Sequence, residues 1–524
     1  MSSLFHPALP MADSWLRRRT ALFYRFKCFL TFSSCLAGWV LTVSAQEEVE
    51  RPTASSMSLK QCVILALQQT FDLKIQEVSR DIAAERVGVA KAEYEPALTA
   101  TIDYRDTTDP GGTDVQTGDF VGSKTQTVRA DTGITGLLPS GGRYTVGASA
   151  TDTDGERGPD PFSNGSITGP YAELRQPLLE NFKIDDTRLN IRVSLQNLQI
   201  STLELKQSML RVVNQVEEAY YGLVAAEENV RVQQMALSLA EELWRENQKR
   251  VEHGDMAPIE AAEAQSQAST TKAALLLAER QFRAQQNILK GAMVDDFAQW
   301  RSVMIVSEGN LTTEPISFDY RQSWSRAMTS RPDLLTYKVQ LEQQELVQER
   351  RKNELLPELD LTATAGLAGS DTEVSGAFKQ VRDQDAPYFS LGFSLALPLG
   401  NRRDKANHKI AIAETRQAEL RLRQFRQSVM IEIDDAVSQA KTDFQRITAT
   451  REAREFAELA LKNEQGKLNR GASTNFVVLQ LQRNLTSARS DEIQSLADYS
   501  RSLSRLRFAE GSSLDAHQVD LTAE

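Results

Sequence analysis

The sequence predicts a mostly α-helical fold that also contains membrane β-strands, with one pattern written twice along the chain. Three observations predict this fold: long stretches without proline, segments in which polar and apolar residues alternate, and an internal repeat. Of the 524 residues, 41% are hydrophobic and 25% are charged, and only 16 are proline. This composition is typical of long helices with ordinary surfaces. The net charge of −11 argues against a nucleic-acid partner, because such binding depends on basic patches.

The first element, residues 1–45, has the features of a signal peptide. A basic stretch that includes Arg17 and Lys27 precedes an apolar segment, 28–43, and a small-residue cleavage pattern ends at Ala45. The alternative is an uncleaved anchor, but the apolar segment is shorter than the roughly 20 residues that a spanning helix needs. We expect export by the general secretory route followed by cleavage of the signal peptide, because a protein that forms a membrane barrel must reach the outer membrane unfolded.

Cleavage would leave Cys62 as the only thiol of the mature chain, so no intrachain disulfide is expected. Cys35 lies inside the apolar segment and not at its end, which argues against lipid attachment. The sequence has no second long apolar run, so a membrane crossing would have to use β-strands.

The chain is duplicated. A shift of 217 residues lays Val216–Ala219 on Ile433–Ala436 and Gly254 on Gly471, and a shift of 261 lays Pro96 on Pro357. The two shifts differ by 44, so the first copy carries that many extra residues between its helices. We therefore expect an organisation with these boundaries: signal peptide 1–45, first repeat 46–291, linker or equatorial segment 292–318, second repeat 319–510 and polar C-terminal tail 511–524.

Each copy begins with a short helix followed by strands. The helices are expected at 72–92 and 333–353, and each ends before a proline that cannot continue it. Alternating segments follow at 98–105 and 359–365, and another spans 388–397. Alternation with period two predicts strands with one wet and one apolar face, although a strand of an ordinary sandwich would show the same pattern.

The extra residues of the first copy contain a predicted hairpin, 127–137 and 143–151, with a turn at 139–142. The sequence leaves open whether this hairpin joins a membrane wall or lies beside it. Segments rich in Gly and Asp predict exposed loops at 106–124, 152–169 and 369–386.

Long helices follow in both copies, at 186–252 and 404–469, and each stops before a glycine, Gly254 or Gly471. Shorter helices are expected to return at 258–290 and 475–508. Apolar residues of the first long helix follow coiled-coil spacing at Met209, Val213, Val216, Tyr220, Leu223 and Val230.

Helix lengths predict a gap beside each long helix. The short helix and the returning helix, stacked end to end, fall short of the long helix by roughly 20 Å. The irregular segments 292–331 and 509–524 are long enough to fill such a gap as a belt.

The strands cannot form a membrane wall from one chain. A closed bacterial barrel has at least about eight strands, whereas the sequence predicts four secure strands and two less certain ones. An open sheet in lipid would leave backbone groups unsatisfied, at several kcal/mol each. The chain must therefore pool strands with other copies, although this argument does not fix their number.

The mature sequence resembles the TolC-like outer membrane efflux protein family over nearly all of its length. The resemblance is carried by the duplication and by short motifs in a fixed order: Arg331–Leu335, Leu355–Leu359, Leu397–Arg402, Gly471–Thr474 and Val478–Gln482. It implies a homotrimer in the cell outer membrane, with a 12-stranded β-barrel from four strands per chain, joined to an α-helical tunnel across the periplasm.

The same resemblance implies a passive exit duct for drugs, metals or other small molecules. It further implies outer-membrane lipid around the barrel, a periplasmic adaptor protein that docks on the duct, and an inner-membrane pump coupled through the adaptor. A duct for type I protein secretion is an alternative within the family.

The resemblance places the adaptor contact and the closing tip at the two helix–turn–helix ends. The corresponding residues are Gly254, Asp255, Gly471, Ser473 and Thr474. A member of the family has a cation-binding gate of two aspartates, six and nine residues after the second turn glycine.

This sequence departs from that pattern, because Val477 and Gln480 stand at those two positions. The same offsets in the first copy hold Glu260 and Glu263, which share a helical face. We hypothesise that three chains present these carboxylates as a gate, although an ordinary solvated acidic face is the simpler interpretation.

Two other classes of protein fit the sequence less well. An enzyme is not expected, because the mature chain keeps only three histidines and lacks phosphate-loop, zinc-protease and nucleophile-elbow motifs. No cofactor or metal is expected for the same reason. A periplasmic coiled-coil scaffold without a barrel remains an alternative, and the alternating segment 388–397 argues against it.

Overall fold

The structure is a computed structural model that describes residues 53–113, 118, 120–157, 160–309, 311 and 319–518. All of them belong to one unit of the chain. The predicted signal peptide lies outside the described residues. None of the described helices carries an apolar stretch long enough to span a membrane.

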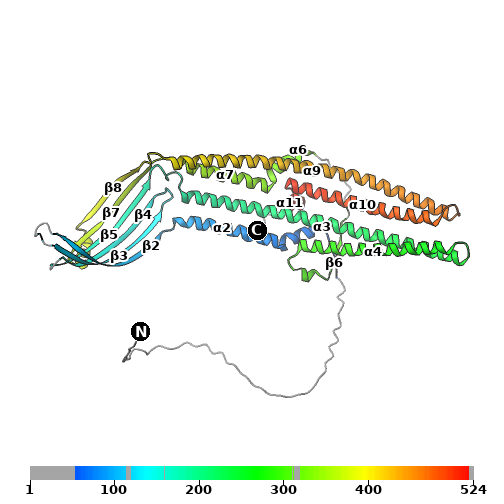
Figure 1. Ribbon diagram of the computed structural model, residues 1–524, viewed down its shortest axis with the longest axis horizontal. Helices are drawn as coiled ribbons and strands as arrows, with labels where there is room; N and C mark the ends of the chain where they lie inside the picture. The colour runs from blue at the N-terminus through cyan, green and yellow to red at the C-terminus, as the bar shows by residue number, and fades with distance from the viewer. Residues whose placement is uncertain are drawn as a thin grey trace, which may run out of the picture. The chain divides into compact units, whose positions relative to one another are not determined.

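Two long helices dominate the fold (Figure 1). They are α3 (Asp186–Glu252) and α9 (Arg402–Leu468), each of 67 residues. The bounds of α3 agree with the prediction, since Asp185 caps its start by accepting a hydrogen bond from the Arg188 amide at 2.7 Å. Helices α4 (Pro258–Met293) and α10 (Asn475–Glu510) return beside them.

The helices lie side by side in a fixed order. Near the sheet, α2 (Phe71–Lys91) packs on α3, α3 on α7 (Pro332–Asn353), and α7 on α9. Toward the turns, α4 packs on α3, α3 on α10, and α10 on α9. One flank of the layer is therefore formed by α2 and α4, and the other by α9.

The main core surrounds the middle of α3. Val213, Val216, Tyr220 and Leu223 of the predicted seam are buried there. They pack against α1 (Leu59–Gln69) and a parallel pair of short strands, β1 (Thr53–Met57) and β6 (Val303–Ser307). The short helix α5 (Phe297–Trp300) adds Trp300 to this core. Helix α6 (Tyr320–Ser330) packs on α9 in a separate cluster, and the 3-10 helix η1 (Ala92–Tyr94) follows α2 beside the sheet.

The segment expected to be a polar tail is, in its described part, packed against α3. Helix α11 (Ser513–Ala516) buries Leu514 in the main core, and His517 Nε2 lies 2.8 Å from Oε1 of the buried Glu217. Leu514 anchors the described part of this segment in the core, which the overall polarity of 511–524 did not reveal.

The other half of the fold is one antiparallel sheet in the order β2-β3-β4-β5-β7-β8. Its strands are β2 (Ala97–Thr113), β3 (Phe120–Leu137), β4 (Arg143–Arg157), β5 (Asp160–Pro177), β7 (Glu358–Asp371) and β8 (Pro387–Ala396). Figure 1 shows the sheet at the end of the helical layer opposite the helical turns.

Two expectations about this sheet were wrong. The chain contributes six strands to it and not the four that the family resemblance implies, because the extra hairpin lies inside the sheet as β3 and β4. The loops predicted at 106–124 and 152–169 are mostly strand, and 369–386 contains helix α8 (Val374–Asp383). The first two of these Gly- and Asp-rich segments stay extended because they find ladder partners, as in the pairing of Thr107 with Thr125.

Residues paired across the ladder share a face, so the sheet has one apolar and one polar side. Ile102 is paired with Ala130, and Phe393 with Leu361. Ile102 is 80% exposed and Phe393 is 68% exposed in the single chain. The opposite face carries mainly hydroxyl and charged side chains, which are hydrated without cost. A sheet of this kind suits a wall between lipid and water.

Candidate functional site: the hairpin tips and the groove between them

The tip of the first helical hairpin is a glycine-terminated turn. Gly254 has φ of +81°, a left-handed conformation that favours glycine. Its amide donates to the Val251 carbonyl at 3.0 Å, and the Asp255 amide donates to the Arg250 carbonyl at 2.8 Å. This pair of bonds satisfies carbonyls that the end of α3 would otherwise leave free, as in a Schellman motif.

The second tip repeats this geometry. Gly471 has φ of +75°, and its amide donates to the Leu468 carbonyl at 3.0 Å. The Ala472 amide donates to the Lys467 carbonyl at 2.9 Å. The sequence thus predicted both turns correctly from their glycines, and the two tips are built alike.

A polar cluster fixes the second tip from the side. Ser473 Oγ donates to Glu464 Oε1 at 2.5 Å, and Lys467 Nζ donates to Glu464 Oε2 at 2.8 Å. The Lys467 and Ser473 hydrogen bonds lower the pKa of Glu464. Thr474 precedes α10 as its cap residue but makes no side-chain capping bond. The Asp255 side chain of the first tip is exposed.

The two hairpins are joined near their tips. The buried Asn475 side chain donates from Nδ2 to the Glu260 carbonyl at 3.3 Å, and Arg250 Nη2 lies 3.5 Å from Asn469 Oδ1. Val478 and Leu479 of α10 pack nearby against Leu243 of α3. These contacts hold the two tips together at one end of the helical layer.

Glu260 and Glu263 lie in the first two turns of α4, where the prediction placed them. Glu260 is half-buried and Glu263 is exposed. Within the described part of the chain, neither carboxylate takes part in a hydrogen bond or ion pair. Both are thus free to meet a cation or another chain, but one chain does not bring further carboxylates to them.

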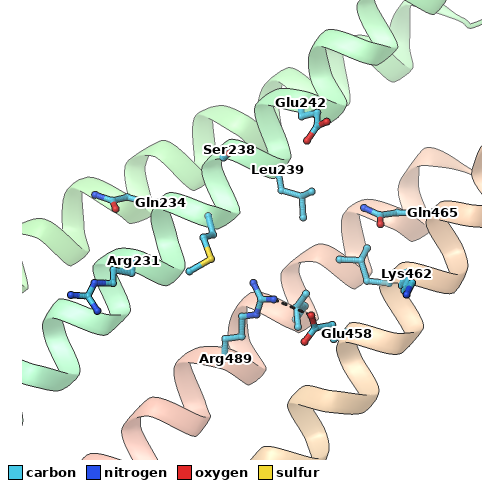
Figure 2. A pocket seen from close by; sticks show the side chains of 12 residues that line it. Arg231, Gln234, Ser238, Leu239, Glu242, Glu458, Lys462, Gln465 and Arg489 are labelled. Atoms are coloured by element: carbon cyan, nitrogen blue, oxygen red, sulfur yellow. Dashed lines mark hydrogen bonds and ion pairs between the residues drawn. The ribbon is translucent and has the colours of Figure 1, made fainter. Parts of the chain in front are cut away.

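A groove that the sequence did not reveal lies between the hairpins (Figure 2). It has a volume of about 760 Å³ and is lined by α3, α9 and α10. Met235 and Leu239 supply apolar surface, and Arg231, Glu242 and Lys462 supply charges. Among its lining residues, Arg489 Nη2 of α10 lies 3.5 Å from Glu458 Oε1 of α9.

Sequence reasoning missed the groove because its walls come from helices more than 200 residues apart. The only local signal is a stripe of mixed polarity on α3, at 231, 234, 235, 238, 239 and 242, which keeps helical spacing. Within this stripe Leu239 packs against the cluster that joins α3 to the other hairpin, whereas the remaining side chains are exposed.

In the described ranges, no three His, Cys, Asp or Glu side chains gather as metal ligands would. His253 is exposed at the first tip, and its Nδ1 lies 2.7 Å from the Lys249 carbonyl oxygen.

Comparison with known proteins agrees with this architecture. The sequence pattern of the family described as outer membrane efflux protein matches residues 146–293 and 324–512, one stretch in each repeat. A curated relative is the pyoverdine export outer membrane protein OpmQ of Pseudomonas putida, 25% identical over 313 residues. That match covers 57% of this chain and 61% of the relative.

Solved structures share the fold. A membrane protein from Pseudomonas aeruginosa has a TM-score of 0.62 at 18% identity, with 86% of this chain and 92% of that chain covered. The CmeC outer membrane channel of Campylobacter jejuni has a TM-score of 0.59 at 17% identity, covering 87% and 86%. The outer membrane protein VceC of Vibrio cholerae has a TM-score of 0.61 at 16% identity, covering 86% and 96%.

The family pattern covers more than half of the sequence and falls in both repeats. The structure also has the TolC-like fold of the solved outer-membrane channels. The chain belongs to the outer membrane efflux protein family.

Proposed function

We propose that three copies of this chain form the outer-membrane exit duct of a tripartite efflux system. The observation that carries this proposal is that one chain leaves unpaired surfaces on both of its sides, at the sheet edges and at the flanks of the helical layer. In this proposal, neighbouring chains cover them. The duct catalyses no reaction in this proposal, and the energy for transport comes from a partner pump.

The first such surfaces are the edges of the sheet. In the described residues, β2 and β8 each pair with a strand on one side only. In lipid, the free N–H and C=O groups of such edges would cost several kcal/mol each. Pairing β8 of one chain with β2 of the next removes both edges when the ring closes.

The second surfaces are the flanks of the helical layer. On α2, Ile75, Val78, Ile82 and Val89 are exposed at spacings of three, four and seven residues, and form one apolar stripe. On the opposite flank, α9 exposes Ile410, Ile412, Leu420 and Ile431. Contacts between different flanks generate a ring by rotation, and the resemblance to the family supports three chains.

The hairpin tips and the groove between the hairpins supply a docking place for a periplasmic adaptor. An amphipathic helix of the adaptor would lay apolar residues on Met235 and Leu239 and meet charges at the rim, such as Glu242 and Lys462. The adaptor would connect the duct to an inner-membrane pump. Gly254, Asp255, Gly471, Ser473 and Thr474 would meet it at the tips.

Glu260 and Glu263 are proposed as the gate. Three chains would bring six carboxylates close to the axis, where they would attract cations and hold the tips until an adaptor displaces them. In Glu260→Gln/Glu263→Gln, we expect weaker cation selectivity and weaker block by multivalent cations in planar bilayers. Unchanged selectivity and unchanged block would remove this assignment and leave the duct proposal intact.

The cargo class rests on the relative that exports pyoverdine. Its name supports a small organic molecule as cargo and gives no support to protein secretion. Family membership likewise favours a channel over a coiled-coil scaffold without a barrel.

The duct proposal is tested with the purified full-length chain. We expect it to fractionate with outer membranes, to run as a trimer in mild detergent and to give ion conductance in planar bilayers. A monomer without conductance would contradict the proposal.

A further inference from the structure

We infer that the exit end of this duct is an 18-stranded barrel with an open, porin-sized lumen, which admits bulky polar solutes that a 12-stranded exit would exclude. The inference rests on the proposed trimer. It concerns the outer end of the duct and is independent of the gate at the helical tips.

The strand count comes from the sheet of one chain. The hairpin of β3 and β4 lies between β2 and β5, and each of its strands pairs along nearly its whole length on both sides. The hairpin is thus part of the wall and cannot be a flap beside it. Six strands from each of three chains make 18.

The count fixes the approximate width. Strands about 4.8 Å apart and tilted by about 40° give a backbone diameter of roughly 36 Å for 18 strands and roughly 24 Å for 12. Side chains fill about 5 Å on the inner side of the wall, half the usual distance between packed sheets. The remaining lumen is about 26 Å wide for 18 strands and about 14 Å for 12.

The polar face of the sheet, which would line the lumen, carries mostly short side chains. Its members include Thr101, Thr127, Ser149, Thr153, Ser166, Thr362, Thr364 and Ser390, which the ladder places on one face. Two arginines on this face are paired along the wall: Arg175 with Asp360 at 2.6 Å and Arg129 with Asp131 at 2.8 Å. Short hydroxyl side chains leave the lumen wide and wet.

The helix inserted between two strands, α8, lies outside this lumen. It packs over Gly165 and Gly369, where an added Cβ would overlap the Val374 amide and the Ala377 carbonyl oxygen. Strand β7 alternates without a bulge, so Gly369 is on the same face as Leu361, the apolar face. Helix α8 therefore covers the outer side of the wall and does not plug the channel.

The test uses two adjacent positions on β7 that face opposite ways. Thr362→Cys places a thiol on the polar face near the helical end of the sheet, and Leu361→Cys places one on the apolar face at the same depth. Maleimides attached to inert polymers of increasing size are added to intact cells that express each full-length variant. The unsubstituted chain is the background control.

We expect polymers up to a diameter of about 20 Å to label Thr362→Cys, because they pass a lumen of about 26 Å. No polymer should label Leu361→Cys. If only polymers narrower than about 14 Å label Thr362→Cys in a trimeric, membrane-embedded protein, the wall has fewer strands and the inference is overturned. Absence of a trimer or of outer-membrane insertion would instead overturn the proposed function.

A shortened chain gives an independent comparison. Replacing residues 114–159 by Asn-Gly joins β2 to β5 through a two-residue turn and leaves four strands. We expect the size limit for labelling Thr362→Cys to fall to about 14 Å in this variant. An unchanged limit would contradict the inference, and failure of the shortened chain to fold leaves the full-length pair decisive.

Discussion

The tip glycines illustrate how single residues set the ends of the long helices. Gly471 adopts a left-handed conformation, whereas Gly466, five residues earlier, lies inside α9, where an added Cβ would meet only the end of the Arg470 side chain. Gly471 therefore requires a left-handed backbone, whereas Gly466 requires a right-handed helical one.

We predict that Gly471→Ala destabilises the second tip by about 1 kcal/mol, because an L-residue pays that much in the left-handed region. Gly466→Ala is the matched control and should stabilise the helix by about 0.5–1 kcal/mol. Amide hydrogen exchange around residues 467–475 measures both effects. Equal changes in the two variants would contradict this account of the turn.

Cys62 provides a pH-dependent prediction. Its thiol is fully buried in the main core, and burial raises its pKa from 9.0 to about 12. The folded-state pKa lies above the unfolded one, so the thiol's contribution to stability is present below pH 9 and is lost as pH rises toward 12. We expect Cys62→Ala to lose less stability than the unsubstituted chain between pH 9 and 12, measured by urea unfolding. An equal loss would show that the thiol does not titrate with folding.

Arg331 shows what a sequence motif does physically. It is buried, and its guanidinium bonds Asp333 at 2.7 Å, Glu432 at 2.7 Å and the Ala509 carbonyl at 3.1 Å. It thereby ties the junction of α6 and α7 to α9 and to the end of α10. The motif Arg331–Leu335, which includes Asp333, was recognisable in the sequence, but the partners Glu432 and Ala509 lie about 100 and 180 residues away and could not be read from it.

At the scale of elements, the long helices were predictable, whereas short helices such as α8 and the ends of the strands were not. The bounds of α3 follow from the cap at Asp185 and the stop at Gly254, which are both local signals. The ends of β2 to β5 that lie far from the helices carry no such signal. Thr, Gly and Asp dominate there, so apolar and polar residues no longer alternate along the strand. Their extended state depends on partners across the ladder. The groove between the hairpins was hidden for the same reason.

Helix α8 allows a prediction about such an element. We expect Gly369→Leu to detach α8 from the sheet, since the leucine would occupy the space of the Ala377 carbonyl. The Gln380 side chain, which bonds the Ser370 amide at 3.0 Å and its carbonyl at 3.1 Å, would lose both bonds. Protease cleavage within 374–386 on intact cells should then rise several-fold.

Gly392→Ala is the control for that experiment, because the space around Gly392 holds only the Thr362 hydroxyl and lies away from α8. An increase in cleavage that is the same in both variants would indicate general damage to the sheet, and the assigned role of Gly369 would then be wrong.

At the scale of the whole molecule, the exposed stripe on α2 predicts the subunit contact. We expect Ile82→Glu to reduce the trimer population more than tenfold, because it would bury an unpaired carboxylate against a neighbouring chain. Ala84→Glu adds the same charge at an exposed position on the same helix, but points about 200° away around the axis. Native mass spectrometry in mild detergent compares the two variants, and similar losses would contradict the assigned interface.

The two repeats are equal in their helices and unequal in their strands, since α3 matches α9 in length and α4 matches α10, whereas the first copy brings four strands to the sheet and the second brings two. A hairpin adds one upward and one downward strand, so its insertion preserves the direction of every later element. The wall can therefore gain or lose strands in pairs while the chain re-enters each long helix with the same polarity. Duplication or loss of a single hairpin would thus let evolution adjust the bore of the exit without redesigning the helical part.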